Sequence, residues 1–74
     1  MTAYKVLIAD DNSVDRKVLS RVVRNQGNDV IEATNGFEAV DIFTEHRPDI
    51  VLMDVMMPGL NGKEATRQIK SIAN

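Results

Sequence analysis

The sequence predicts an α/β fold in which helices cover a parallel sheet. Two short apolar runs, Val6–Ala9 and Ile50–Met53, are typical of buried parallel strands because they are almost continuous in aliphatic residues. Segments with helical periodicity alternate with such runs, as in βαβ units with right-handed crossovers. Aspartates follow both runs directly, namely Asp10, Asp11 and Asp54. Ligands of open α/β sheets bind at this end of the strands, so the pattern also predicts where a site lies.

The first strand is expected at Lys5–Ala9 and the first helix at Ser13–Asn25. Apolar residues share one face of this helix and most charged residues lie elsewhere, which is the pattern of a surface helix that packs on a sheet. The apolar set is Val14, Val18, Leu19, Val22 and Val23. Gly27 ends the helix.

The second strand is expected at Asp29–Ala33, the second helix at Gly36–His46, the third strand at Asp49–Met53 and the third helix at Lys63–Ile72. The second helix has the apolar set Phe37, Val40, Ile42 and Phe43, and the third is buried through Ala65, Ile69 and Ile72. Both helices follow the same pattern, Asn-Gly-x-Glu-Ala, at residues 35–39 and 61–65. An Asn N-cap with Glu three residues later resembles a capping box. A short internal duplication is the alternative interpretation.

Length and composition indicate one small soluble domain. The chain has 74 residues, a net charge of −2 and no cysteine. No basic stripe indicates nucleic-acid binding, and no stretch approaches the roughly 20 apolar residues of a membrane span. The lack of cysteine agrees with a reducing compartment, so we expect a cytoplasmic protein.

The three aspartates are expected to point into one crevice at the carboxyl end of the sheet. Crowded carboxylates repel one another unless a cation relieves the repulsion. Mg²⁺ favours carboxylate, carbonyl and water oxygens, so the sequence predicts a magnesium site at Asp10, Asp11 and Asp54. The alternative for the first pair is a favourable interaction with the helix N-terminus, worth about 0.3–1 kcal/mol. Asn12 and Ser13 lie closer to that terminus, which favours the metal site.

Three stretches together resemble the receiver domain of two-component response regulators. They are residues 6–12 (VLIADDN), residues 35–39 (NGFEA) and residues 48–62, in which PDIVLMD is followed by MPGLNG. Their order and spacing match that family along the whole chain. The resemblance implies a flavodoxin-like, doubly wound sheet in which these three strands take the order 2-1-3.

The resemblance also implies a role for each aspartate. In that family the aspartate at the position of Asp54 accepts a phosphoryl group from the phosphohistidine of a histidine kinase. The residue at Asp11 binds Mg²⁺ directly, the one at Asp10 usually binds it through water, and the backbone carbonyl at Met56 completes the protein ligands. We therefore expect a signalling domain that is not an enzyme, beyond at most self-catalysed phosphorylation of Asp54.

A complete receiver domain has five strands and five helices in sheet order 2-1-3-4-5. By this resemblance, residues 1–74 form a truncated domain that comprises the first three βα units and lacks the last two. The absent units carry a Ser/Thr and a Lys. The Lys supplies positive charge in a complete receiver, and losing one such electrostatic donor costs roughly 10²–10³ in rate. Phosphorylation is therefore expected to be impaired. The alternative is a non-signalling fragment that acts in folding, dimerisation or protein interaction.

Small size and a free strand edge together predict a homodimer. Below roughly 70–80 residues a single core seldom supplies more than about 3–5 kcal/mol. In the order 2-1-3 the third strand is an edge, although its sequence is that of a central strand without Lys or Pro. The third helix is also expected to leave apolar surface bare around Ile69 and Ile72. We expect two copies to meet at their third strands, antiparallel, in a six-stranded sheet.

Other functional sites fit the sequence less well. Phosphatases of the haloacid-dehalogenase type end a strand with Asp-x-Asp, whereas Met56 and Asn12 stand two residues after Asp54 and Asp10. The run from Asp10 also lacks the Gly and Glu of an EF-hand. His46 ends a helix, where a cationic cap is ordinary. The methionines at 53, 56 and 57 fit a strand and a turn better than a soft-metal site.

Overall fold

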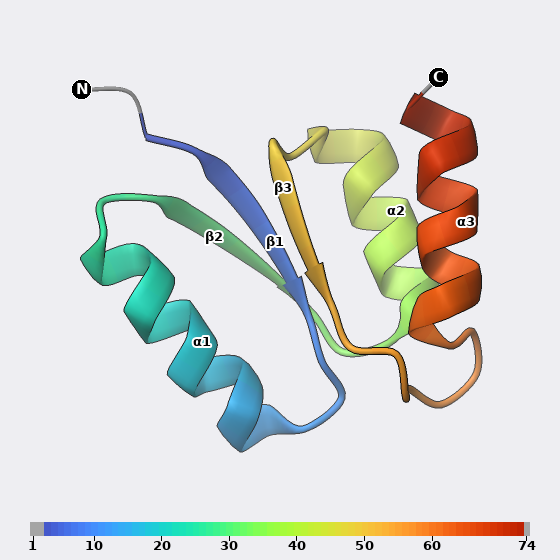
Figure 1. Cartoon of the computed structure of the whole chain (residues 1–74), viewed down its shortest axis with the longest axis horizontal. Coiled ribbons are helices and arrows are strands. Elements are labelled where there is room, and N and C mark those ends of the chain that lie inside the picture. The colour runs from blue at the N-terminus through green and yellow to red at the C-terminus, as the bar shows by residue number, and fades with distance from the viewer. Residues whose placement is uncertain (1–2, 74) are drawn as a thin grey trace.

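The computed structural model describes residues 3–73 and contains the six predicted elements in the predicted order (Figure 1). The strands are β1 (Lys5–Ala9), β2 (Asp29–Ala33) and β3 (Ile50–Met53). The helices are α1 (Ser13–Asn25), α2 (Gly36–His46) and α3 (Gly62–Ala73). Compared with the prediction, β3 begins one residue later and α3 extends one residue further at each end. No helix within residues 3–73 is long and apolar enough to span a membrane.

The sheet is parallel throughout and has the order β2-β1-β3, which confirms the predicted fold class. Leu7 in the central strand lies opposite Ile31 on one side and Val51 on the other. The pairing continues past the strands, because the amide of Asp10 donates to Ala33 O (3.1 Å) and the amide of Asp54 donates to Ala9 O (2.9 Å). The carboxyl ends of the three strands are therefore level, and the residues that follow them start from one edge of the sheet.

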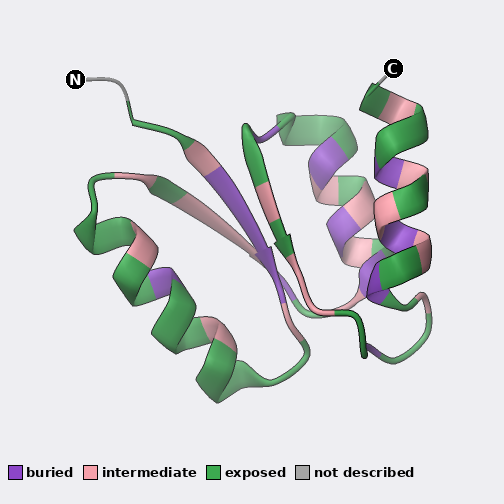
Figure 2. Cartoon of the chain, in the orientation of Figure 1, coloured by how far each residue is buried: buried purple, intermediate pink, exposed green. Residues whose placement is uncertain are grey.

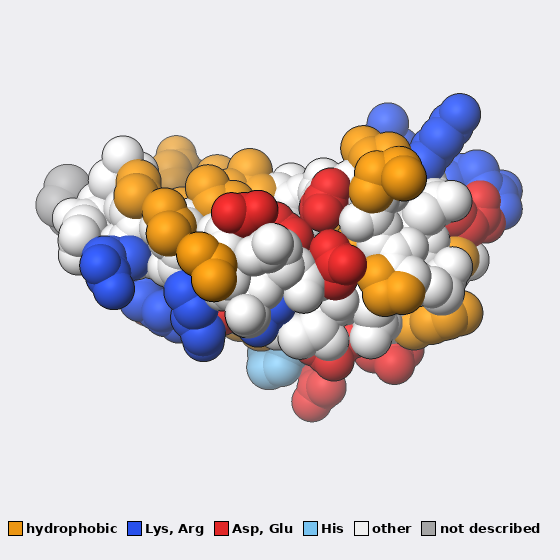
Figure 3. Space-filling view, turned by 90° about the horizontal axis from the view of Figure 1, so that it is seen from below, with side chains coloured by type: hydrophobic (Ala, Val, Ile, Leu, Met, Phe, Trp, Pro, Cys, Tyr) orange, Lys and Arg blue, Asp and Glu red, His pale blue; other side chains and the backbone are white. Residues whose placement is uncertain are grey.

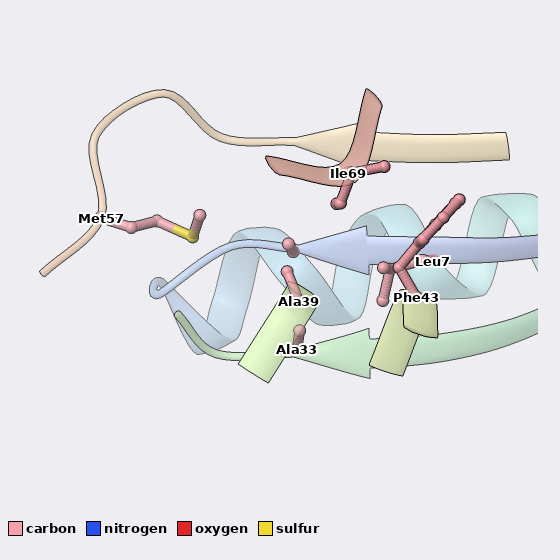
Figure 4. Close-up of a cluster of buried hydrophobic side chains, with 7 residues drawn as sticks. Leu7, Ala33, Ala39, Phe43, Met57 and Ile69 are labelled. Carbon is pink, nitrogen blue, oxygen red and sulfur yellow. The ribbon is translucent and has the colours of Figure 1, made fainter. Parts of the chain in front are cut away.

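The main core lies on the face of the sheet that α2 and α3 cover (Figure 4). Strand residues point to alternate faces, so this face receives every second residue of β1 and its neighbours. The core cluster is Leu7, Ala9, Ala33, Ala39, Phe43, Met57 and Ile69. Ile69 is buried and Ile72 packs against the cluster, so the expectation that α3 leaves these residues bare is wrong. They pack because α3 lies side by side with α2 and faces the same core.

Helix α1 covers the opposite face in a way that the sequence did not predict. Its apolar residues are largely exposed, with Val14 69% and Val18 57% accessible, so the predicted buried face is wrong (Figure 2). The least exposed positions are Arg16, Ser20 and Val23, spaced four and three residues apart, and only Val23 belongs to the predicted apolar set. This spacing defines one helix face. Compared with the predicted orientation, α1 is rotated about its axis so that Arg16 faces Glu32 of β2.

Each helix begins at an asparagine. Oδ1 of Asn12 accepts from the amides of Val14 and Asp15 at 3.0 Å each, and Oδ1 of Asn35 accepts from the amide of Glu38 at 2.8 Å. Asn61 accepts from the amide of Glu64 at 2.9 Å. These bonds confirm the predicted N-caps. The reciprocal bond of Glu38 goes to the amide of Thr34 (3.0 Å), one residue before the cap.

Ser20 provides a test of the α1 packing. Its hydroxyl is buried and has no hydrogen-bond partner among the described residues. An unsatisfied buried polar group costs about 1–3 kcal/mol, so Ser20→Ala should raise the free energy of unfolding by about 1 kcal/mol in urea denaturation. Ser71→Ala on the exposed side of α3 is the matched control, because it carries the same change in helix propensity. Equal effects of the two substitutions on the free energy of unfolding would contradict the burial of an unpaired Ser20 hydroxyl.

Candidate functional site

Three aspartates meet at the carboxyl edge of the sheet. One carboxylate oxygen from each of Asp10, Asp11 and Asp54 lies within 4.8 Å of the others, although the residues come from two different strand ends. Asp10 and Asp54 are half-buried and Asp11 is exposed. Seen from this edge, acidic side chains gather in the middle of the molecule, beside a row of hydrophobic side chains (Figure 3). The structure therefore brings together all three aspartates that the sequence singled out.

Local hydrogen bonds orient two of the three carboxylates. Oδ1 of Asp10 accepts from the amide of Asn12 at 2.9 Å, so it closes the turn that leads into α1. Oδ1 of Asp54 accepts from the amide of Met56 at 3.2 Å and closes the corresponding turn after β3. Met56 lies next to the cluster, and 79% of its surface is exposed. Each of these carboxylates is thus held through one oxygen by the turn that it begins.

The loop after β3 returns to the site through a glycine. A Cβ added to Gly62 would overlap the backbone carbonyl of Asp54, and its amide donates to Val55 O at 3.0 Å. Gly36, at the equivalent place in the repeated pattern, likewise lies against the carbonyl of Leu60. The close backbone approach explains why glycine follows Asn in both copies of the pattern. At Gly62, this approach packs the start of α3 against the backbone of the candidate acceptor.

A buried ion pair lies behind the cluster and was missed in the sequence. Nε of Arg16 donates to Oε1 of Glu32 at 3.0 Å, and Nη1 of Arg16 donates to the backbone carbonyl of Asp10 at 2.7 Å. Only 11% of the Arg16 side chain and 17% of the Glu32 side chain are exposed. Lys17 and Arg24 approach the other oxygen of Glu32 at 3.2 and 3.7 Å. The helical spacing of Arg16, Ser20 and Val23 was the only sequence signal that this face of α1 meets the sheet. The valines on the neighbouring face obscured that signal.

The cations around Glu32 change its acidity. Burial raises the pKa of Glu32, but hydrogen bonds and charge attraction from Lys17 and Arg16 together lower it further, so the pKa lies below the ordinary value of 4.5. The carboxylate is therefore the form that the folded protein favours.

The donor set of the cluster fits a hard divalent cation. All three side chains offer carboxylate oxygens, which suit Mg²⁺, and Met56 adds a backbone carbonyl nearby in sequence. A hollow of about 510 Å³ between α1 and β3 borders the cluster and is lined by Asp10, Asp15 and Asp54. It leaves the carboxylates accessible from solvent. His46 is not part of the site: its carbonyl accepts a bond from Lys5 (3.4 Å) at the other end of β1.

Comparison with known proteins shows which family this chain is similar to. The family model of the response regulator receiver domain matches residues 6–74. Protein PilH of Pseudomonas aeruginosa is 42% identical over 65 residues, covering 88% of this chain and 54% of that protein. Sporulation initiation phosphotransferase F of Bacillus subtilis is 41% identical over 72 residues, covering 97% of this chain and 58% of that protein.

Solved structures agree with these sequence relatives. The response regulator domain of Thermotoga maritima CheB superposes with a TM-score of 0.92 at 38% identity, covering 97% of this chain and 55% of that chain. The chain thus spans between half and three fifths of the length of these similar proteins.

The pKa of Glu32 predicts a pH-dependent contribution to stability. Because the folded pKa is depressed below 4.5, this contribution is present above that pH and is lost as the pH falls through the folded value. Glu32→Gln should therefore lower the free energy of unfolding by about 1–2 kcal/mol near neutral pH, and this deficit should shrink at acidic pH. Urea denaturation from about pH 7 to pH 3 measures it, with Glu45→Gln on the exposed side of α2 as control. A deficit that is constant over this range would contradict the prediction.

Proposed function

The chain belongs to the response regulator receiver domain family, and from this premise we propose that Asp54 accepts a phosphoryl group from a histidine kinase. We further propose that Mg²⁺ is held by Asp10, Asp11 and Asp54, with the backbone carbonyl of Met56 completing the protein ligands. The observation that carries this proposal is the convergence of the three carboxylates within 4.8 Å, from two strand ends, Ala9 and Met53, that lie 44 residues apart in sequence.

The proposed reaction is nucleophilic catalysis by a carboxylate. An oxygen of Asp54 attacks the phosphorus of a phosphohistidine, the phosphorus–nitrogen bond breaks, and the imidazole leaves with the bonding electron pair. Such transfers need alignment and charge neutralisation more than covalent assistance, because negative charge spreads over the transferred oxygens. Mg²⁺, when bound, supplies positive charge beside these oxygens. The turn bond from the Met56 amide to Oδ1 of Asp54 (3.2 Å) supports this role, since it orients the carboxylate in advance.

The reaction can be tested with a small phosphodonor. Incubating the protein with acetyl phosphate and Mg²⁺ should give a phosphoryl adduct that mass spectrometry detects on the intact chain. Asp54→Asn should abolish the adduct, whereas Asp41→Asn on the exposed side of α2 should leave it unchanged. Chelation of Mg²⁺ should slow the labelling by roughly 10²–10³, the order expected for losing one electrostatic donor.

A whole receiver domain labelled in parallel serves as the reference. We propose that these 74 residues are labelled more slowly, because the resemblance places two further charge and switch residues in units that they do not include. Retention of the adduct in Asp54→Asn would refute the acceptor assignment. The same conclusion would follow if the reference were labelled and this protein remained unmodified.

The free edge of the sheet favours a second function, self-association. β3 pairs only with β1 within residues 3–73, and Ile50 and Leu52 are 40% and 39% exposed. Neither Lys nor Pro interrupts the strand, so its unpaired backbone groups can accept another strand. We propose that two copies pair antiparallel at β3 around a two-fold axis, which gives a six-stranded sheet. The protein would then act as a dimerisation or interaction module, with or without phosphorylation.

Leu52→Lys tests this dimer. A charge on the edge should disfavour strand pairing, so size exclusion with light scattering should show dissociation and circular dichroism should show loss of structure at the same concentration. Val18→Lys on α1 introduces the same charge at an exposed residue away from the edge and should leave the dimer intact. A cooperatively folded wild-type monomer at micromolar concentration would rule the dimer out.

A further inference from the structure

We infer that Arg16 is a positioning residue for the cation site, because it ties the turn that carries Asp10 and Asp11 to strand β2. The inference rests on the function proposed above, in which these aspartates hold Mg²⁺. It assigns a role to a side chain that touches neither the ion nor the transferred group.

The geometry of Arg16 is that of a bridge. Its Nη1 donates to the carbonyl of Asp10 at 2.7 Å, and its Nε donates to Oε1 of Glu32 at 3.0 Å. A guanidinium holds its donors in a rigid planar fork, so it keeps two acceptors at a set separation. Both side chains are mostly buried, at 11% and 17% exposed, which protects the contact from solvent.

The anchored end of this bridge is firmly placed. Glu32 lies in β2 opposite Ile8 of β1, in a parallel pairing that includes every residue of both strands. Lys17 and Arg24 approach its Oε2 at 3.2 and 3.7 Å, so the carboxylate is surrounded by cations. Arg16 therefore links the turn to a strand that is paired along its whole length with the central strand β1.

The other end of the bridge controls the orientation of Asp11. The carbonyl of Asp10 and the amide of Asp11 belong to one planar peptide group, so fixing the carbonyl also fixes the plane from which Asp11 starts. Asp10 is held at its amide by Ala33 O (3.1 Å) and at its carboxylate by the amide of Asn12 (2.9 Å). Asp11 is exposed, and the peptide held by Arg16 supplies the constraint nearest to it.

The sign of the effect separates positioning from simple electrostatics. Arg16 is a cation close to a cation site. If only charge mattered, removing it would strengthen Mg²⁺ binding, because the Coulomb repulsion between the two cations would be lost. A positioning role predicts weaker binding. Lys17 shares the Glu32 carboxylate and is the adjacent residue, but its recorded contact is with Glu32 and not with Asp10. It is therefore the matched control for loss of charge.

The experiment compares Arg16→Met with Lys17→Met. Mg²⁺ is titrated into each protein while amide chemical shifts of Asp11, Asn12 and Asp54 are followed, at a temperature where all variants are folded. Arg16→Met should raise the Kd about tenfold, the lower end of the range for lost outer contacts of a metal ligand. Lys17→Met should leave the Kd unchanged or slightly lower it. The Asp11 and Asn12 amides should also shift in ion-free Arg16→Met, because the turn is released.

Two further variants distinguish positioning from general destabilisation. Val23→Ala trims another half-buried residue on the same face of α1 and should lower stability without changing the Kd. Arg16→Lys keeps the charge but not the fork, so it should give an intermediate Kd, and it serves as the test if Arg16→Met does not fold. Wild-type Mg²⁺ affinity in both Arg16 variants, or tighter binding in Arg16→Met, would overturn the positioning role of Arg16 and leave the proposed metal site standing. A wild-type titration that stays flat to about tens of millimolar would overturn the proposed metal site and this inference with it.

Discussion

The parallel pairing of β1 with both of its neighbours is the constraint on which the rest of the structure depends. Residues 6–9 are buried on both faces, so this strand has only one stable place, in the middle of the sheet. Its register with β2 and β3 makes the strand ends level. The carboxylates that follow β1 and β3 are then brought together as a consequence of backbone pairing, before any interaction among the side chains themselves. A slip of the register would disperse the site.

The two faces of the sheet are stabilised by different interactions. On one face, α2 and α3 bury a continuous apolar cluster around Leu7 and Phe43. On the other face, α1 contacts the sheet through Arg16, Ser20 and Val23, whereas Val14, Val18 and Val22 stay largely exposed. The apolar face therefore provides most of the hydrophobic stabilisation. The polar face sets the orientation of the turn that carries the site.

Repeated use of Asn-Gly serves two purposes that are separate in physical terms. The asparagine caps a helix through its side chain, which is a local interaction and was predictable from residue type. The glycine permits two backbones to approach so closely that a methyl group would overlap a carbonyl oxygen. That need arises only when the loop after β3 folds back on α2 and on Asp54. One pattern thus combines a local and a tertiary requirement.

The sequence by itself determined the order and nearly all the bounds of the six elements, and it identified Asp10, Asp11 and Asp54 as neighbours. These features follow from short-range periodicity and from the rule that parallel strands end at a common edge. Only the tertiary structure decided which face of α1 meets the sheet and that Arg16 reaches Glu32 and the Asp10 carbonyl. A helical apolar stripe indicates a buried face only when something covers it, and what covers a face depends on neighbours far away in the chain.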